Sequence, residues 1–325
     1  MIPPSRPPSL CGRVFRGRDA VDAGLLTPKQ LRSRAWRRLY RDVYADAELS
    51  PTHGLAIAGA ALIASTSAVF GGRSAAYLLG AESLVDSSSP VEVIVPEHDR
   101  FGAVTGLRIR RTSLPDSHIR SVGRYRCTTP LRTALDIACA EQLAESVVAL
   151  DVLLGRGLVR ALDLLEAAAA RPAGRGTRQA RRAVDLADAR AESPPESRLR
   201  VLLRLAGLTP VPQYVVRDAA GNFVARVDLA FPELRVAIEY DGAWHGKPGQ
   251  LAHDRRRLNA LVAAGWTVLH VTATDLHDPA PLVAAVRQLL AERDRGVGAH
   301  SRTDQGALSP RSEREVRLRG RARRS

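Results

Sequence analysis

The sequence has few cysteines and no long apolar run, and each shortage excludes a class of protein. Its three cysteines are odd in number and lack metal-ligand spacing, so they exclude a disulfide scaffold and a zinc finger and favour a reducing cytoplasm. No apolar run approaches the ~20 residues that a membrane-spanning helix needs, so we expect no membrane partner. The Pro- and Arg-rich start lacks the apolar core of a secretory signal. No Walker or Rossmann glycine loop is present, and no Ser or Cys nucleophile has a partner pattern.

Lysine supplies only two of the 48 basic residues, and the 325-residue chain has a net charge of +14. Because a GC-rich genome favours arginine, the position of the charge is more informative than its total. Residues 1–48 carry ten basic and five acidic residues, and residues 294–325 carry nine and four, so the two ends hold ten of the 14 net charges. Basic ends on a nearly neutral body indicate contact with a polyanion, most commonly nucleic acid; a solvated tail is the alternative.

Pro, Gly and charge patterns divide the chain into six segments and predict a multidomain protein of mixed α+β and α/β class. The middle of the chain alternates predicted helices and strands, including strands at 91–95 and 107–111, and then becomes helical and Ala-rich. The predicted segments are a disordered leader (1–11), a winged helix-turn-helix (12–48), a mixed α/β domain (49–140), a helical linker (141–191), a compact α/β domain (192–293) and a disordered basic tail (294–325).

The winged helix-turn-helix is predicted from a helix that ends at Gly24, a basic helix over 28–36 and a basic ribbon over 36–44. In such a domain the second helix enters the major groove and the wing follows the phosphates. The predicted DNA-binding cations are Lys29, Arg32, Arg34, Arg37, Arg38 and Arg41. A plain solvated face is the alternative for this charge run.

The segment 192–293 has the element order αβββαβα, with predicted strands at 211–216, 223–231, 234–240 and 266–271. Asp228 lies within one apolar strand and Glu239 within the next, and a carboxylate in such a strand is costly unless it is paired or binds a metal. Strand alternation predicts Glu239 and Asp241 on one face, with Asp228 and His245 nearby. Such a group of oxygen ligands is typical of Mg²⁺, which activates water and neutralises phosphodiester charge.

The motifs Val227–Pro232, Ile238–His245, Asp254–Leu258 and Ala264–Leu269 resemble the DUF559 family. That family is similar to the very-short-patch-repair endonucleases of the PD-(D/E)xK superfamily. The resemblance implies a restriction-endonuclease-like fold and hydrolysis of phosphodiester bonds with Mg²⁺ or Mn²⁺. It implies that Asp228 is the central metal ligand and that Glu239 is a second ligand or acts through a water. It also implies that Asp241 and His245 stand where the repair enzymes keep a catalytic His pair, and that Glu196 is the helical acid.

One position departs from the superfamily pattern. The Lys expected two residues after the second acid is Asp241, and the nearest Lys is Lys247. The role of that Lys would fall to His245, to Arg255 or Arg257, or to no residue. Arg255 and Arg257 are also candidate phosphate ligands, although a charge run is usually a solvated face. An inactive fold that still binds DNA is therefore a second hypothesis.

The front half is similar to the AbiEi-like antitoxins of type IV toxin–antitoxin systems. The motifs that carry this resemblance are Leu39–Tyr44, Gly71–Ala76 and Thr129–Asp136. It implies a winged helix-turn-helix that binds operator DNA. Two functions follow as hypotheses: a cytoplasmic, metal-dependent endodeoxyribonuclease acting on double-stranded DNA, or a DNA-binding regulator with an inactive nuclease fold. RNA as the nucleic acid stays open, and no protein partner is predicted.

Overall fold

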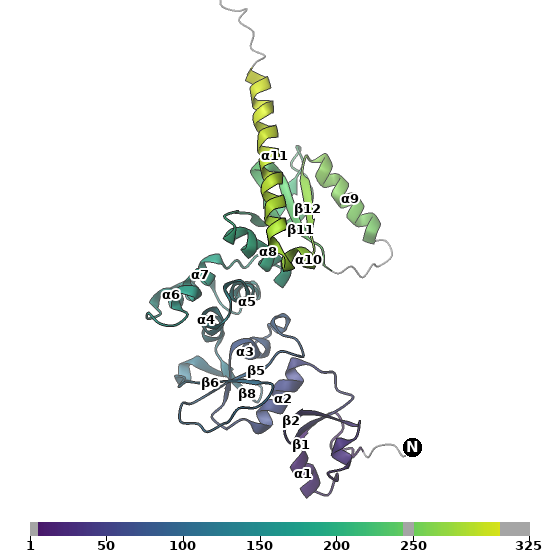
Figure 1. The fold of residues 1–325 in the computed structure, drawn as a ribbon, viewed down its shortest axis with the longest axis vertical. Helices are drawn as coiled ribbons and strands as arrows, with labels where there is room; N and C mark the ends of the chain where they lie inside the picture. The colour runs from purple at the N-terminus through teal and green to yellow at the C-terminus, as the bar shows by residue number, and fades with distance from the viewer. Residues whose placement is uncertain (1–5, 243–249, 306–325) are drawn as a thin grey trace, which may run out of the picture. The chain divides into compact units, whose positions relative to one another are not determined.

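The computed structural model describes residues 6–242 and 250–305, with side chains described through residue 242 and from residue 254 to residue 295. The chain forms two compact units, Met1–Val201 and Leu202–Ser325, whose elements are labelled in Figure 1. The helix α8 (Pro194–Leu205) contains the boundary between them. No helix in the described part of the chain is both long and apolar enough to cross a membrane.

The first unit begins with a three-stranded antiparallel sheet in the order β1-β3-β2. Its elements are β1 (Val14–Arg16), α1 (Gly17–Asp22), the 3-10 turn η1 (Gln30–Arg32), β2 (Trp36–Tyr40) and β3 (Val43–Asp46). The ribbon is confirmed by β2 and β3. The basic helix predicted over 28–36 is wrong, because only η1 is helical there. Leu31, Ala35 and Trp36 are drawn into the small core of this sheet, and such packing overrides the weak helical preference of a short segment.

The predicted disordered leader is wrong for residues 6–11. Arg6 forms an ion pair with Asp46 over 2.7 Å, and Leu10 is buried in the same core as Phe15 and Trp36. The proline content of this segment excludes a helix or an inner strand but does not prevent a turn from packing. The Arg6–Asp46 contact therefore ties the start of the described chain to the end of β3.

A five-stranded sheet follows, in the order β6-β5-β4-β8-β7. The strands β5 (Val91–Val95) and β6 (Leu107–Arg111) have the predicted bounds, whereas β4 (Val69–Phe70), β7 (Ile119–Val122) and β8 (Tyr125–Thr128) were not predicted. The three missed strands have two to four residues, too few for a periodic pattern. The connecting helices are α2 (His53–Ile63), α3 (Gly72–Leu78) and the 3-10 turns η2 (Glu82–Leu84) and η3 (Asp116–His118).

A helical layer completes the first unit, as the Ala-rich pattern predicts. It contains α4 (Pro130–Ala140), α5 (Leu143–Gly155), α6 (Ala161–Ala170), α7 (Thr177–Leu186) and the start of α8. Small side chains such as Ala134, Ala180 and Ala183 are fully buried with Leu150 and Leu153, so the helices pack closely.

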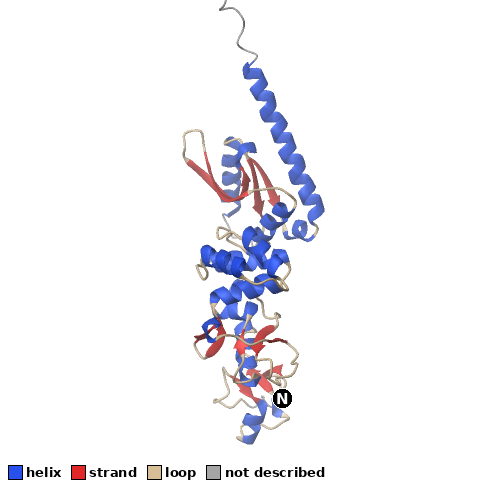
Figure 2. Cartoon of the chain, turned by 90° about the vertical axis from the view of Figure 1, so that its left-hand side faces the viewer, coloured by secondary structure: helices blue, strands red, loops and turns tan. Residues whose placement is uncertain are grey.

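The second unit has one four-stranded sheet in the order β12-β11-β10-β9, drawn in red in Figure 2. Its strands are β9 (Val211–Arg217), β10 (Phe223–Phe231), β11 (Val236–Tyr240) and β12 (Thr267–Val271), with η4 (Pro232–Leu234) between the second and third. The pair β10–β11 is antiparallel and β11–β12 is parallel. The predicted order αβββαβα is confirmed, with one additional short helix, α10 (Ala273–His277).

The helix α9 (Gln250–Ala263) packs against β10 and β12 in this unit. Leu261 of α9 is fully buried with Val227 and Trp266, so α9 is fixed against the strands that carry the predicted acids. The closing helix α11 spans Pro279–Gln305. The disordered tail predicted from residue 294 is therefore wrong through residue 305, because the polar sequence continues the helix; residues 306–325 lie outside the described chain.

Candidate functional site

Asp228 and Glu239 lie opposite each other on neighbouring strands. The register pairs Leu229 with Ile238 and Ala230 with Ala237, and one further step of the same antiparallel pairing places Asp228 across from Glu239. Directly opposed residues share a face of the sheet, with Cβ atoms about 4.5–5.5 Å apart. Asp228 Oδ2 also accepts a 2.9 Å hydrogen bond from the N–H of Tyr240. The sequence-based expectation that the two carboxylates meet at one end of a hairpin stays a prediction.

Glu239 is 7% exposed, and its carboxylate is held by Arg257 of α9. Arg257 donates from Nη1 to Oε2 over 2.7 Å and from Nη2 to Oε1 over 2.5 Å. Its Nη2 also donates to the carbonyl oxygen of Arg226 over 2.7 Å. This bidentate geometry is the strongest form of arginine–carboxylate contact. The sequence predicted Arg257 as a phosphate ligand or a solvated residue, and neither prediction included its contact with Glu239.

Several carboxylates surround the guanidinium of Arg257 and act on its pKa. The hydrogen bonds from Arg257 to Glu239 raise the pKa of the guanidinium, and the charges of Glu239, Asp228 and Asp254 raise it further. Arg257 therefore stays protonated and supplies the positive charge among three carboxylates. Its side chain is 32% exposed, so the site opens to solvent on the arginine side.

Asp241 contacts a histidine of the neighbouring strand β12. The strand β11 ends at Tyr240, and Asp241 is 59% exposed, with its Oδ2 3.5 Å from Nδ1 of His270 on β12. Its backbone N–H donates to the carbonyl of Val271 over 2.7 Å. The predicted grouping of Glu239 and Asp241 on one face stays a prediction, since His270, which Asp241 contacts, is the register partner of Glu239 on β12. The contact with His270 was not predicted, since it depends on the β11–β12 pairing.

The remaining predicted residues of this site have different positions. Glu196 lies at the start of α8, where its carboxylate accepts from Ser193 Oγ over 2.7 Å and from the N–H of Glu192 over 3.2 Å. Those bonds give Glu196 a structural part in starting the helix. Arg255 is exposed on α9. His245 and Lys247 lie outside the described residues.

A divalent cation fits the donor chemistry of this site under one condition. Carboxylate oxygens are hard ligands, and Mg²⁺ is commonly held by one or two carboxylates together with water and substrate phosphate. The described residues contain no cluster of three or more His, Cys, Asp or Glu side chains that could hold a metal. Asp228 and Glu239 supply the two carboxylates, but both oxygens of Glu239 accept from Arg257. A metal at Glu239 would share its oxygens with Arg257 or replace one of those bonds.

The predicted DNA-binding cations of the first unit are divided by the structure into two kinds. Arg37 donates to the carbonyl oxygens of Leu49 over 2.7 Å and Ala47 over 3.1 Å, so its guanidinium serves the local fold. The other five side chains are exposed: Lys29, Arg32, Arg34, Arg38 and Arg41. Their positions on η1, β2 and the adjoining turns leave the charge accessible to a polyanion.

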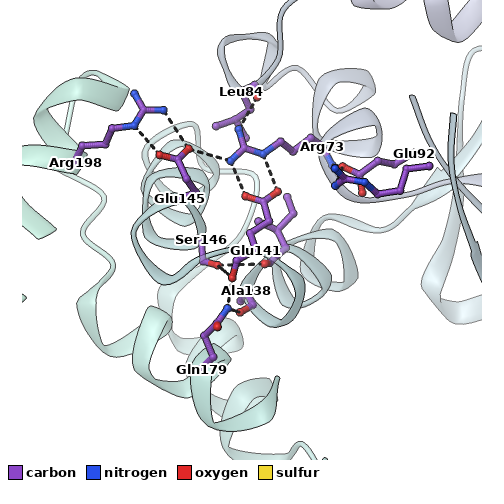
Figure 3. Close-up of polar contacts among 11 residues, drawn as sticks. Arg73, Leu84, Glu92, Ala138, Glu141, Glu145, Ser146, Gln179 and Arg198 are labelled. Atoms are coloured by element: carbon purple, nitrogen blue, oxygen red, sulfur yellow. Dashed lines mark hydrogen bonds and ion pairs between the residues drawn. The ribbon is translucent and has the colours of Figure 1, made fainter. Parts of the chain in front are cut away.

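The motif Gly71–Ala76 places Arg73 in an ion-pair network within the first unit, shown in Figure 3. Arg73 donates to both oxygens of Glu141, over 2.7 and 2.5 Å, and Nη2 lies 3.3 Å from Glu145. Glu145 in turn accepts from Arg198 over 2.7 and 3.1 Å. The network joins α3, α5, α8 and the residue that follows α4, so Arg73 connects elements that are distant in sequence.

Comparisons with known proteins give one clear relationship. No protein-family model matches the sequence. Among solved structures, the catalytic domain of the homing endonuclease I-Bth0305I has 23% identity and a TM-score of 0.26, covering 30% of this chain and 95% of that domain. The RV2827C protein of Mycobacterium tuberculosis has 14% identity and a TM-score of 0.37, covering 63% of this chain and 79% of that one.

The sequence relatives are two Mycobacterium tuberculosis proteins, Uncharacterized protein Rv2248 and Uncharacterized protein MT2308. Each is 34% identical to this chain over 206 residues, which span 62% of this chain and 69% of the relative. Identity at this level over more than two thirds of the relative means that the chain belongs to the family of the M. tuberculosis proteins Rv2248 and MT2308.

Proposed function

We propose that this protein is a metal-dependent nuclease of double-stranded DNA. The observation that carries the proposal is the contact of Arg257 of α9 with Glu239 on β11, next to Asp228 of β10, which accepts from the N–H of Tyr240. A buried acid beside a second acid and a permanent cation is typical of a site that handles a phosphodiester. The motif resemblance to the PD-(D/E)xK nucleases supports the same chemistry.

The residues of the chain have separate parts in such a reaction. Asp228 and Glu239 would hold Mg²⁺ or Mn²⁺, which supplies an activated water and neutralises charge on the phosphate. Arg257 and the exposed Arg255 lie on the same helix and offer guanidinium groups to phosphate oxygens. His245, outside the described residues, is the proposed acid–base group.

The exposed cations of the first unit are the proposed contact with the DNA duplex. Phosphate neutralisation by Arg and Lys dominates non-specific affinity for nucleic acid, and these five residues lie within 13 positions of sequence. With the recognition helix absent from the described fold, the ribbon β2–β3 and the turn η1 are left as the elements that would meet the backbone.

The test is conversion of supercoiled plasmid DNA by the purified protein with Mg²⁺ or Mn²⁺. We expect nicked or linear products from the wild type, and none from Asp228→Ala. Glu233→Ala is the matched control, because Glu233 is an exposed acid on η4 of the same unit. Equal inertness of the wild type and Asp228→Ala on duplex, single-stranded and branched DNA would reject the enzyme.

The contact between Arg257 and Glu239 favours a second candidate, a DNA-binding regulator whose nuclease fold does not cut. A permanent cation that bonds both oxygens of Glu239 neutralises that carboxylate without a metal. This candidate predicts salt-sensitive binding to a specific duplex by the wild type. The double variant Asp228→Asn/Glu239→Gln should bind the same duplex as the wild type does. Loss of repression by this variant in a reporter assay would contradict the regulator.

A further inference from the structure

Glu239 of β11 has room for one cationic partner at a time. Its side chain is 9% exposed, and each of its two oxygens already accepts from a different nitrogen of Arg257. A divalent ion bonded to one of those oxygens would lie within a few ångströms of the guanidinium. Two cations so close in a partly buried site repel each other strongly, because the local dielectric constant is far below that of water.

The opposite arrangement, with neither cation present, is also unfavourable. A buried carboxylate without a charged partner loses its hydration with nothing to replace it. Glu239 therefore needs one cation, and the fold offers Arg257 when no metal is bound. Replacement of Arg257 by a metal ion at Glu239 requires no rearrangement of β10 or β11, since Arg257 reaches the acid from a different element, α9.

A third bond shows how Arg257 is held in this state. Nη2 donates to the carbonyl oxygen of Arg226 on β10 while Nη1 and Nη2 hold Glu239 on β11. The guanidinium thus spans both strands of the candidate site. Because the side chain is 32% exposed, it has an open direction in which to move when it leaves Glu239.

We propose that Arg257 and a divalent cation are mutually exclusive partners of Glu239, so that Arg257 keeps the site closed to metal until the ion displaces it. Arg257 is thereby a positioning residue that acts through Glu239, and its displaced guanidinium is delivered beside the metal site, where it can hold a phosphate oxygen of the substrate. The inference rests on the proposed nuclease function for the identity of the substrate, but not for the competition itself.

The competition has a measurable consequence for metal affinity. A ligand that must first displace an internal group binds with an apparent Kd equal to the intrinsic Kd divided by the fraction of molecules in which that group has left the site. Removal of the internal cation therefore tightens metal binding. If Arg257 were merely structural, its removal would have the opposite effect on metal affinity, because its loss would loosen the strands and weaken any metal site on them.

The test is titration of the full-length protein with Mn²⁺, with the free ion measured by electron paramagnetic resonance. We expect Arg257→Gln to bind Mn²⁺ at least ten times more tightly than the wild type, and the added substitution Asp228→Ala to abolish that gain. Arg256→Gln, at an exposed position of the same helix, is the matched control and should equal the wild type. Equal or weaker binding by a folded Arg257→Gln, or no Mn²⁺ binding by either protein, would overturn the proposal.

A measurement on the wild type covers the case in which Arg257→Gln does not fold. The ¹⁵Nη resonances of Arg257, assigned by their loss in Arg257→Lys, should shift and lose protection from solvent exchange as Mg²⁺ saturates the site. A resonance that stays unchanged while Mg²⁺ saturates the protein would show that the two cations do not compete.

These outcomes separate the competition from the nuclease. Plasmid cleavage that requires Asp228, together with equal Mn²⁺ affinity in the wild type and Arg257→Gln, would reject the competition and retain the nuclease. Tighter Mn²⁺ binding by Arg257→Gln without cleavage of any nucleic acid would retain the competition and reject the nuclease.

Discussion

Arg200 donates from Nη2 to Asp151 Oδ2 over 2.7 Å inside the first unit, where the two side chains are only 6% and 1% exposed. Arg200 Nη1 also donates to the carbonyl of Leu186 over 2.6 Å, and Asp151 Oδ1 accepts from the N–H of Asp188 over 2.7 Å. The pair therefore links α5, α8 and the end of α7. It is the interior counterpart of the more accessible network at Arg73.

The first prediction concerns this buried pair. Arg200→Met removes one partner and leaves Asp151 buried without its cation, which typically costs about 3–5 kcal/mol of unfolding free energy. Urea unfolding followed by circular dichroism measures the loss. The matched control is Arg160→Met, which breaks an ion pair to Asp163 whose arginine is 80% exposed; it should leave stability near that of the wild type. Equal losses of unfolding free energy in Arg200→Met and Arg160→Met would contradict the assignment of Arg200 and Asp151 as a buried ion pair.

The second prediction concerns the coupling of Arg257 to Glu239. We expect Arg257→Met to destabilise the protein by about 2–3 kcal/mol, less than for a fully buried pair because the arginine is 32% exposed. The double variant Arg257→Met/Glu239→Met should recover most of that loss, since no unpaired charge remains. A double-mutant cycle in urea gives the coupling energy. Purely additive effects would show that the two side chains do not interact.

The third prediction concerns Gly176, which begins α7 with a φ of 78°. A Cβ there would lie 2.4 Å from the carbonyl oxygen of Cys139, which belongs to the backbone and cannot rotate away. Gly157 has a φ of 67° and no atom within 4 Å of its Cβ position, so Gly157→Ala carries only the conformational cost of about 1–2 kcal/mol. Gly176→Ala should lower the thermal unfolding temperature clearly more than Gly157→Ala. A similar shift for both would exclude the clash.

The fourth prediction concerns pH. The hydrogen bonds from Arg198 hold the pKa of Glu145 below its usual range, with the charge of Arg73 adding to the effect. The ionised form is therefore bound more strongly in the folded state, and the resulting stability is present above the unfolded pKa of about 4.3 and is lost as pH falls through the folded pKa. Glu145→Gln should destabilise the protein at pH 7 and have little further effect at pH 3.

The control for that experiment is Glu82→Gln, since Glu82 is an exposed acid on η2. At pH 7 and again at pH 3, the urea unfolding midpoint of Glu82→Gln should equal that of the wild type at the same pH. A destabilisation by Glu145→Gln that is equal at pH 7 and pH 3 would mean that packing, and not charge, is the source of the effect.

The fifth prediction rests on the proposed contact with nucleic acid. A triple variant of Arg32, Arg34 and Arg38 to Gln should weaken duplex binding and reduce the slope of log K against log salt by about 3, because each phosphate contact contributes roughly 0.9. Arg37→Gln should lower stability and leave the slope unchanged, because Arg37 is bonded to backbone carbonyls. Fluorescence anisotropy at several salt concentrations measures both. An unchanged slope in the triple variant would exclude this surface.

The second unit could be predicted closely from the sequence because its strands are long, apolar and separated by turn residues. The strand Phe223–Phe231 has its predicted bounds, and its antiparallel pairing with β11 follows from the short connection at Pro232. Local pattern was sufficient here because the elements that meet are adjacent in sequence.

Sequence reasoning failed where tertiary contacts decide the outcome. The segment 28–36 has helical spacing, but Leu31 and Trp36 are buried with Phe15, so only one 3-10 turn forms. The Arg257–Glu239 contact was missed for a related reason. The two residues are 18 positions apart on a helix and a strand, and no periodicity in the sequence shows which of three consecutive arginines faces the sheet.

The anchoring of Arg257 to both strands limits how this chain can vary over evolution. Addition or loss of a residue ahead of α9 changes only the length of the connection, and the helix can keep its packing against the sheet. The same change inside α9, between Arg257 and the buried Leu261, turns the guanidinium by about 100° around the helix axis and away from Glu239. Homologues with this site should therefore vary in length before the helix and keep the four-residue interval after the arginine.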